Sequence, residues 1–243
     1  MTKLLTGAAA RPFPMVILMG IMTLFNVALV AWRLHYIQYD FGQINSLSDV
    51  ARYRGNPTFF FLLWNLFLAW IPFLVALRLE KWASSPLRAV AGLALWLVFL
   101  PNAPYLITDL LHLRPRLPVP FWYDVLMIFS FGWTGLLLGF LSLQEVRRFL
   151  EKRLPAWQVY GLEFVFIFLC GLGVFIGRFQ RYNSWDVLAD PLGLAKDVAG
   201  VLLHPFVHLD QLGLAVVLSV LIFLGHWLFR VIIAGYAPGP PQG

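Results

Sequence analysis

The sequence predicts an all-α protein, a polytopic transmembrane helix bundle of about six spans with short interfacial helices on its outer side. Of its 243 residues, 60% are hydrophobic and only 12% are charged, and the mean hydropathy is +0.76. Soluble domains carry about a quarter charged residues. A soluble domain of this size could not cover several long uncharged helices. The composition therefore indicates a membrane protein.

Six apolar segments approach the roughly 20 residues that a helix needs to cross a hydrocarbon core of about 30 Å. The first four carry no charge, the fifth contains Glu163, and the sixth contains His226. We expect residues 1–236 to form a single transmembrane domain and residues 237–243, APGPPQG, to form a disordered tail. The predicted spans are residues 12–32, 58–77, 89–108, 125–144, 157–177 and 211–229.

The loop charges predict a protein of the cytoplasmic membrane with both termini in the cytoplasm. In this orientation ten Lys and Arg lie inside and eight outside, and seven of the inner ten fall in two short loops. Short basic loops on the cytoplasmic side are what the positive-inside rule expects. Because the basic residues are scattered, we expect no nucleic-acid partner. Cys170 is the single cysteine, which excludes an intrachain disulfide.

The third span should be interrupted at the segment Pro-Asn-Ala-Pro, residues 101–104. Two prolines this close cannot continue an unbroken helix, so we expect the span to stop or bend near Leu100, past the midplane. Asp109 and His112 are three residues apart and can touch, as a carboxylate orienting an imidazole or as two ligands of one metal. A resumed helical piece would place on one stripe Tyr105, Thr108, Asp109 and His112.

A second polar segment, residues 177–186 (GRFQRYNSWD), follows the fifth span on the same predicted outer side. The two polar segments can therefore meet. Their arginines would form an anion site, for which a lipid phosphate or carboxylate is the natural guest. The alternative is a closed salt-bridge network in which the aspartates pair with these arginines. The residues concerned are Arg114, Arg116, Arg178 and Arg181, with Asp109, Asp124 and Asp186.

Several further residues support predictions about the spans, and the polar ones allow two interpretations each. Asn65 and Pro72 share one face of the second span, either as a packed kink or as the lining of a cavity. Glu163 is either a functional intramembrane acid or an acid that reaches the inner interface. The pairs Gly135–Gly139 and Gly173–Gly177 predict a close approach of spans four and five. Short interfacial helices are predicted after Ser48 and after Asp190.

Three segments together resemble a known family. WNLFLAWIP, LPNAPYLITDLLHL and GRFQRYNSWD are similar to motifs of the bacterial membrane family called domain of unknown function 1361. The resemblance implies a multi-pass bacterial membrane protein without an assigned activity. The residues that carry it are Asn65, Pro72, Pro101, Asn102, Pro104, Tyr105, Thr108, Asp109, His112, Arg178, Arg181, Asn183, Ser184, Trp185 and Asp186.

The candidate site therefore combines an acid–base group with a basic group, and it faces membrane lipids. The first hypothesis is the binding or processing of an anionic or lipid-linked substrate, with His112 as base. A small transporter and a non-catalytic accessory subunit are the alternatives. The sequence leaves the cofactor open, and it assigns no complete set of metal ligands or catalytic triad to the site. Candidate catalytic residues are Asp109, His112 and Asp186; candidate substrate-binding residues are Arg178, Arg181, Asn183, Arg114, Asn102 and Tyr105.

Overall fold

The computed structural model describes residues 12–40, 42, 52–53, 56–180, 182, 189–190, 192–193, 196, 199–200, 203 and 209–235. Apart from one antiparallel pair of two-residue strands, β1 (Arg52–Tyr53) and β2 (Asn56–Pro57), the elements named below are helices. They are α1 (Pro12–Tyr36), α3 (Phe60–Ala76), α4 (Leu79–Trp82), α5 (Pro86–Phe99), α6 (Asn102–Tyr105), the 3-10 helix η2 (Leu106–His112), α7 (Phe121–Glu151), α8 (Ala156–Phe175), the π-helix η3 (Ile176–Gln180) and α11 (Leu209–Gly235).

The predicted helical membrane architecture is confirmed. Five helical stretches of the described chain are long and apolar enough to cross a membrane: Phe13–Tyr36, Pro86–His112, Phe121–Glu151, Ala156–Gln180 and Leu212–Ile233. The remaining predicted span is α3, an apolar helix of 17 residues. At 1.5 Å per residue α3 is about 26 Å long, slightly less than a typical hydrocarbon core. The chain is a multi-helix membrane protein.

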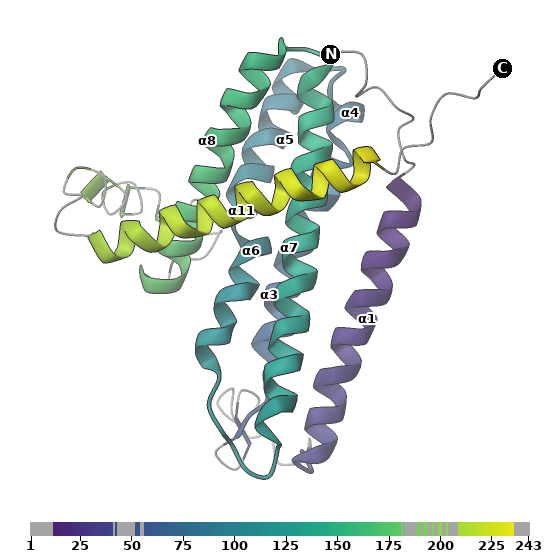
Figure 1. Cartoon of the computed structure of the whole chain (residues 1–243), viewed down its shortest axis with the longest axis vertical. Helices are drawn as coiled ribbons and strands as arrows, with labels where there is room; N and C mark the ends of the chain where they lie inside the picture. The colour runs from purple at the N-terminus through teal and green to yellow at the C-terminus, as the bar shows by residue number, and fades with distance from the viewer. Residues whose placement is uncertain are drawn as a thin grey trace.

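Most helices run along the long axis of the molecule, and α11 lies obliquely across α8 and α7 (Figure 1). One end holds the last turn of α1 and the starts of α3 and α7; we call it the Asp109 end. The opposite end holds α4 and the start of α8, and we call it the Glu163 end. Helix α8 stops well short of the lower tip of the bundle in Figure 1, so η3 lies partway along it.

The third span is interrupted where the two prolines predict it. Helix α5 ends at Phe99, α6 lasts four residues, and the chain then tightens into the 3-10 helix η2. Leu100 and Pro101 keep right-handed helical dihedral angles, so the chain continues in the same direction. The interruption is a change of helix type within one span, which extends from Pro86 to His112.

Glycines of α7 and α8 make room for this interrupted span. A Cβ atom on Gly135 would collide with the carbonyl oxygen of Ala103, and one on Gly173 would lie 2.5 Å from Cγ of Pro101. A Cβ on Gly139 would lie 3.3 Å from Cβ of Ala103. The expectation that these glycines bring spans four and five together is therefore wrong. They accommodate the interrupted span, which packs against both helices.

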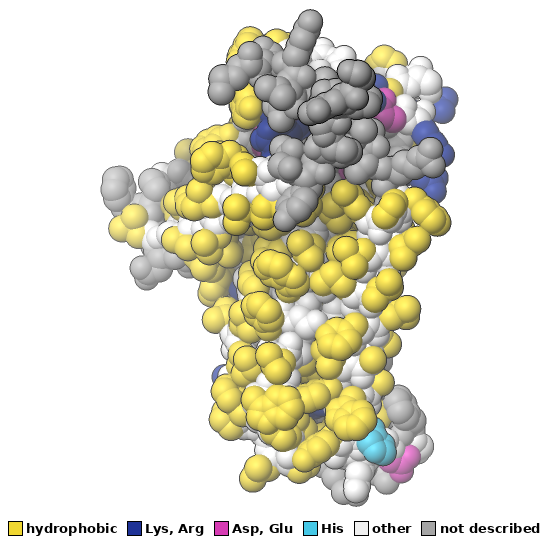
Figure 2. Space-filling model, turned by 45° about the vertical axis from the view of Figure 1, so that its right-hand side comes forward, with side chains coloured by type: hydrophobic (Ala, Val, Ile, Leu, Met, Phe, Trp, Pro, Cys, Tyr) yellow, Lys and Arg dark blue, Asp and Glu magenta, His cyan; other side chains and the backbone are white. Residues whose placement is uncertain are grey.

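The outer surface of the bundle is apolar. Exposed large side chains occur on the spanning helices, for example Leu24 of α1 at 69% exposure and Phe164 of α8 at 65%. Figure 2 shows hydrophobic side chains covering the middle of one face, while most of the visible Lys and Arg lie towards the upper end. A surface of this kind is suited to lipid contact.

Several predicted features lie outside the described residues. They are the tail of residues 237–243, the first short interfacial helix, about half of the second, and the side chains of Arg181, Asn183, Ser184, Trp185 and Asp186.

Candidate functional site

The polar side chains of the third span meet Arg178 of η3 in a cluster that we call the Asp109 cluster. The carboxylate of Asp109, which is 1% exposed, accepts hydrogen bonds on both oxygens. Nη2 of Arg178 lies 2.5 Å from Oδ1, and Nδ2 of Asn65 in α3 lies 3.2 Å from Oδ2. The predicted meeting of the two polar segments is confirmed for Asp109 and Arg178. The cluster consists of Asn65, Tyr105, Thr108, Asp109, His112 and Arg178.

The helix types explain how the cluster is formed. A 3-10 helix has three residues per turn, so side chains three positions apart lie directly above one another. This geometry aligns Asp109 with His112. Thr108, at the same spacing from Tyr105, donates its hydroxyl to the Tyr105 carbonyl at 2.6 Å. Across from η2, the π-helical turn η3 carries Arg178.

Arg178 is already committed to partners inside the protein. Its Nε and Nη2 donate to Oγ1 of Thr108 at 2.9 and 2.7 Å. Its guanidinium carbon lies 4.5 Å from the ring centroid of Tyr105, a cation–π contact. With the Asp109 pair, these contacts make Arg178 an internal clamp. Among the described residues, the closed-network alternative therefore describes Asp109 and Arg178.

His112 is the accessible member of the cluster. Its side chain is 46% exposed, and its Nδ1 lies 3.8 Å from Oδ1 of Asp109, which is within ion-pair range but too long for a hydrogen bond. The imidazole also packs on Phe61, with ring centroids 5.2 Å apart. Asp109 is therefore near enough to attract a protonated imidazole, but it does not hold the ring in one orientation.

The other predicted site residues that the structure describes differ in their surroundings. Tyr105 lies in the cluster, whereas Asn102 directs its amide to the Phe99 carbonyl at 2.9 Å. Arg114 is exposed just beyond His112. Arg116 follows Arg114 in the connection to α7. Its guanidinium donates to the carbonyls of His112 and Arg114 at 3.1 and 3.3 Å and so braces the chain after η2.

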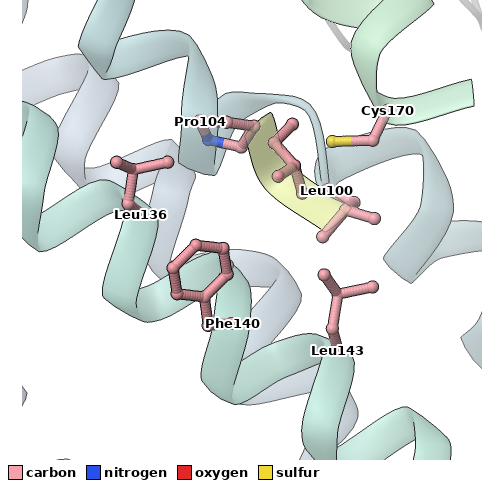
Figure 3. Close-up of a pocket in the computed structure, with 8 residues that line it drawn as sticks. Leu100, Pro104, Leu136, Phe140, Leu143 and Cys170 are labelled. Carbon is pink, nitrogen blue, oxygen red and sulfur yellow. The ribbon is translucent and has the colours of Figure 1, made fainter. Parts of the chain in front are cut away.

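The described residues form no metal site, and the hollow that they line at the interruption of the third span is apolar. No group of three or more His, Cys, Asp or Glu side chains among them is arranged to hold a metal ion. The hollow in Figure 3 is apolar and lies where the third span is interrupted. Leu100 and Pro104 of this span line it, together with Phe140 and Leu143 of α7 and Cys170 of α8. Its water-sized space is about 10 Å³, no more than a single water molecule requires.

A second buried polar group, the Glu163 cluster, lies towards the other end. Oε2 of Glu163 is bonded by Nη1 of Arg147 in α7, and Oε1 lies 2.9 Å from Nδ1 of His226 in α11. Nη1 of Arg230 lies 3.7 Å from Oε2. Glu163 is 7% exposed, so it does not reach the interface as one alternative expected; it is paired within the protein. Glu163 stands out in the sequence as an intramembrane acid, but its partners do not.

A third buried pair, which the sequence did not predict, joins α1 to α7. Nε of Arg33 in α1 donates to Oδ1 of Asp124 in α7 at 2.8 Å, and Nη2 donates to Oδ2 at 3.3 Å. Arg33 is fully buried and also lies over the Phe59 ring, at 4.5 Å from its centroid. Asp124 was expected to pair with arginines of the two polar segments. Arg33 directly follows the first predicted span, and Asp124 directly precedes the fourth on the same predicted side. This placement was the signal from which the pair could have been predicted.

Outside the spans, Glu80 of α4 forms an exposed ion pair with the segment after α7. Its carboxylate accepts from Nη2 of Arg153 at 3.0 Å and from Nζ of Lys152 at 2.7 Å. Hydrogen bonds from Arg153 and then Lys152 lower the pKa of Glu80 from 4.5 to about 2. The contact fastens α4 to the end of α7.

Residues 64–225 match the family described as protein of unknown function (DUF1361), and the chain belongs to that family. The match covers all three resembling segments and confirms the resemblance. No curated protein and no solved structure matches the chain.

Proposed function

We propose that this DUF1361 member binds an anionic lipid headgroup, without chemically changing it, at an exposed basic edge formed by His112 and Arg114. One observation carries the proposal. Arg178 is committed to Asp109 and Thr108, whereas His112 and Arg114 face outward at the same end of the protein. The accessible cation therefore lies at the edge of the Asp109 cluster, next to an imidazole that can donate a hydrogen bond.

The surroundings of the basic edge favour a lipid over a free anion. Leu111 and Leu117 are 66% and 89% exposed, and Trp122 at the start of α7 is 62% exposed. Large apolar side chains beside basic ones are typical of the boundary between headgroups and acyl chains. His112 ends the span Pro86–His112, which is consistent with that depth.

Binding is favoured over catalysis because Asp109 does not orient His112, the base of the first hypothesis. Both of its oxygens are occupied by Arg178 and Asn65, and its distance to His112 exceeds a hydrogen bond. The predicted outward orientation of this end remains a prediction from the loop charges.

The test is lipid binding by the purified protein in detergent, counted by native mass spectrometry with added phosphatidylglycerol or phosphatidylcholine. We expect wild type to bind phosphatidylglycerol preferentially. The variant His112→Gln/Arg114→Gln should bind it roughly fivefold more weakly, because one interfacial charge contributes about 1 kcal/mol.

Arg88→Gln is the matched control, since Arg88 is an exposed arginine at the start of α5. It removes the same charge at the opposite end. An equal loss in this control would show that only net charge matters, and the proposal would be wrong.

An accessory subunit is the second candidate, favoured by the closed Asp109–Arg178 pair. A buried pair that fixes the interrupted span would shape this end for a protein partner. If so, Asp109→Asn/Arg178→Gln should accumulate in the membrane but lose a larger assembly on native gels. An unchanged assembly would count against it.

A further inference from the structure

One ring nitrogen of the Glu163 cluster, Nε2 of His226, has no hydrogen-bond partner among the described residues. His226 is 1% exposed. Its Nδ1 faces Oε1 of Glu163 at 2.9 Å. Because an ionised carboxylate only accepts hydrogen bonds, Nδ1 carries the proton and Nε2 of a neutral ring presents a lone pair.

The cluster is electrically balanced when His226 is neutral. The cations are Arg147 and Arg230, and the anions are Glu163 and Glu151, whose Oε1 lies 2.7 Å from Nε of Arg147. The groups that face the cluster come from α7, α8 and α11. Tyr160 of α8 contributes its ring, 4.4 Å from the guanidinium carbon of Arg147 and 5.9 Å from that of Arg230, and its hydroxyl faces both arginines. A proton on His226 would thus leave one surplus positive charge in a buried site, which is costly.

The two arginines do not hold Glu163 equally. Arg147 is 4% exposed at its side chain and is bonded directly to Oε2. Arg230 is 17% exposed and stands 3.7 Å from that atom. Arg230 also follows His226 by one helical turn, so the two lie on the same face of α11. When positive charge increases at Glu163, we expect the more exposed cation, which stands farther from the carboxylate, to move away first.

We infer that Glu163 and His226 form a proton-binding site in which a proton on His226 displaces Arg230 from Glu163. The proton binds to Nε2, the imidazolium remains bonded to Glu163 through Nδ1, and Arg230 moves towards water. Proton uptake is thereby converted into the release of a basic side chain at the Glu163 end. Glu163 lies seven residues into α8, about 10 Å from its start.

Solid-state NMR of the full-length protein in bilayers tests this exchange with the proton alone as ligand. The ring nitrogens of His226, identified by their loss in His226→Gln, are followed from pH 8 to pH 5. We expect Nε2 to titrate in this range. The contact signal between the Arg230 guanidinium and the Glu163 carboxylate should disappear below the midpoint, while the Arg147–Glu163 signal persists.

Variants of the arginines supply the decisive comparison. Arg230→Gln removes the competing cation, so the His226 midpoint should rise by roughly half a pH unit, about threefold in proton affinity. Arg230→Lys should keep the wild-type midpoint. Arg148→Gln is the matched control, because Arg148 pairs with Glu145 at 2.6 Å rather than with Glu163.

Three outcomes would overturn the inference. In the first, Nε2 does not titrate between pH 8 and pH 5. In the second, the Arg230–Glu163 signal persists below the midpoint. In the third, Arg230→Gln and Arg148→Gln give the same midpoint. If Arg230→Gln does not fold, the Arg230–Glu163 signal of the wild type decides the question alone.

Discussion

The two buried carboxylates of this protein are held in different ways. Asp109 has one arginine and one neutral amide in direct contact, and at 3.8 Å an imidazole that is a cation only when it is protonated. Glu163 has two arginines and a histidine, one of the arginines at longer range. The first arrangement has no second arginine among the described residues, so losing Arg178 leaves a buried carboxylate without a permanent cation. The second has a spare cation, which allows its partners to exchange. The comparison indicates a fixed clamp in one region and an adjustable cluster in the other.

The largest effect is expected from Arg178→Ala. It leaves Asp109 buried without its cation, which should lower the free energy of unfolding by about 3–5 kcal/mol. The melting temperature of the protein in detergent measures the loss. The double variant Asp109→Asn/Arg178→Gln should be less destabilised than the single one, because no unpaired charge remains. Equal losses would show that the pair is not coupled. Arg114→Ala, at an exposed arginine, is the control.

A smaller loss is expected from Glu163→Gln, about 2 kcal/mol. Arg147 keeps Glu151 as a partner at 2.7 Å, and Arg230 is exposed enough to reach water. The same melting measurement applies, with Glu151→Gln as the control because that side chain is 40% exposed. A loss as large as that of Arg178→Ala would contradict the contrast between the two clusters.

Gly135→Ala tests whether the interrupted span depends on its close contact with α7. The added methyl group would collide with the Ala103 carbonyl, a backbone atom that cannot turn aside. Overpacking of this kind costs about 1–3 kcal/mol. Gly161→Ala in α8 is the matched control, since nothing lies within 4 Å of its Cβ position. It should melt at the same temperature or slightly higher, because alanine favours helix. Equal behaviour of the two variants would exclude a tight contact.

The smallest effect concerns Glu80. Its pKa is about 2 in the folded protein and 4.5 as the ordinary value, so its contribution to stability is present above about pH 4.5. That contribution is lost as the pH falls towards 2. The side chain is 45% exposed, so Glu80→Gln should cost less than about 1 kcal/mol at pH 7. The difference in melting temperature from wild type should shrink at pH 3; a larger difference there would contradict the prediction.

The helices could be predicted from the sequence because apolar length decides what can cross a bilayer. The interruption of span three was likewise predictable, since Pro101 and Pro104 restrict the backbone locally. The meeting of Asp109 with Arg178 followed from two polar segments emerging on one side. Each of these depends on local sequence or on the order of the spans.

The partners of buried charges could not be predicted in the same way. Pairing of Arg33 with Asp124, or of His226 with Glu163, depends on how each helix is rotated about its axis. The apolar outer surface gives little information on rotation, because a lipid-facing helix is hydrophobic on every side. For the same reason the glycines of α7 and α8 were assigned to the wrong neighbour.

Helix α7 carries a consequence for the membrane itself. Its 31 residues extend about 46 Å. Asp124 and Arg147 are 23 residues apart on it, about 35 Å, and each is locked into a buried ion pair with another helix. The hydrocarbon core of a typical bilayer is about 30 Å thick. The two pairs therefore hold α7 at a fixed length against its neighbours, and where the bilayer is thinner than the apolar stretch of this helix the protein must tilt or thicken the lipid around it.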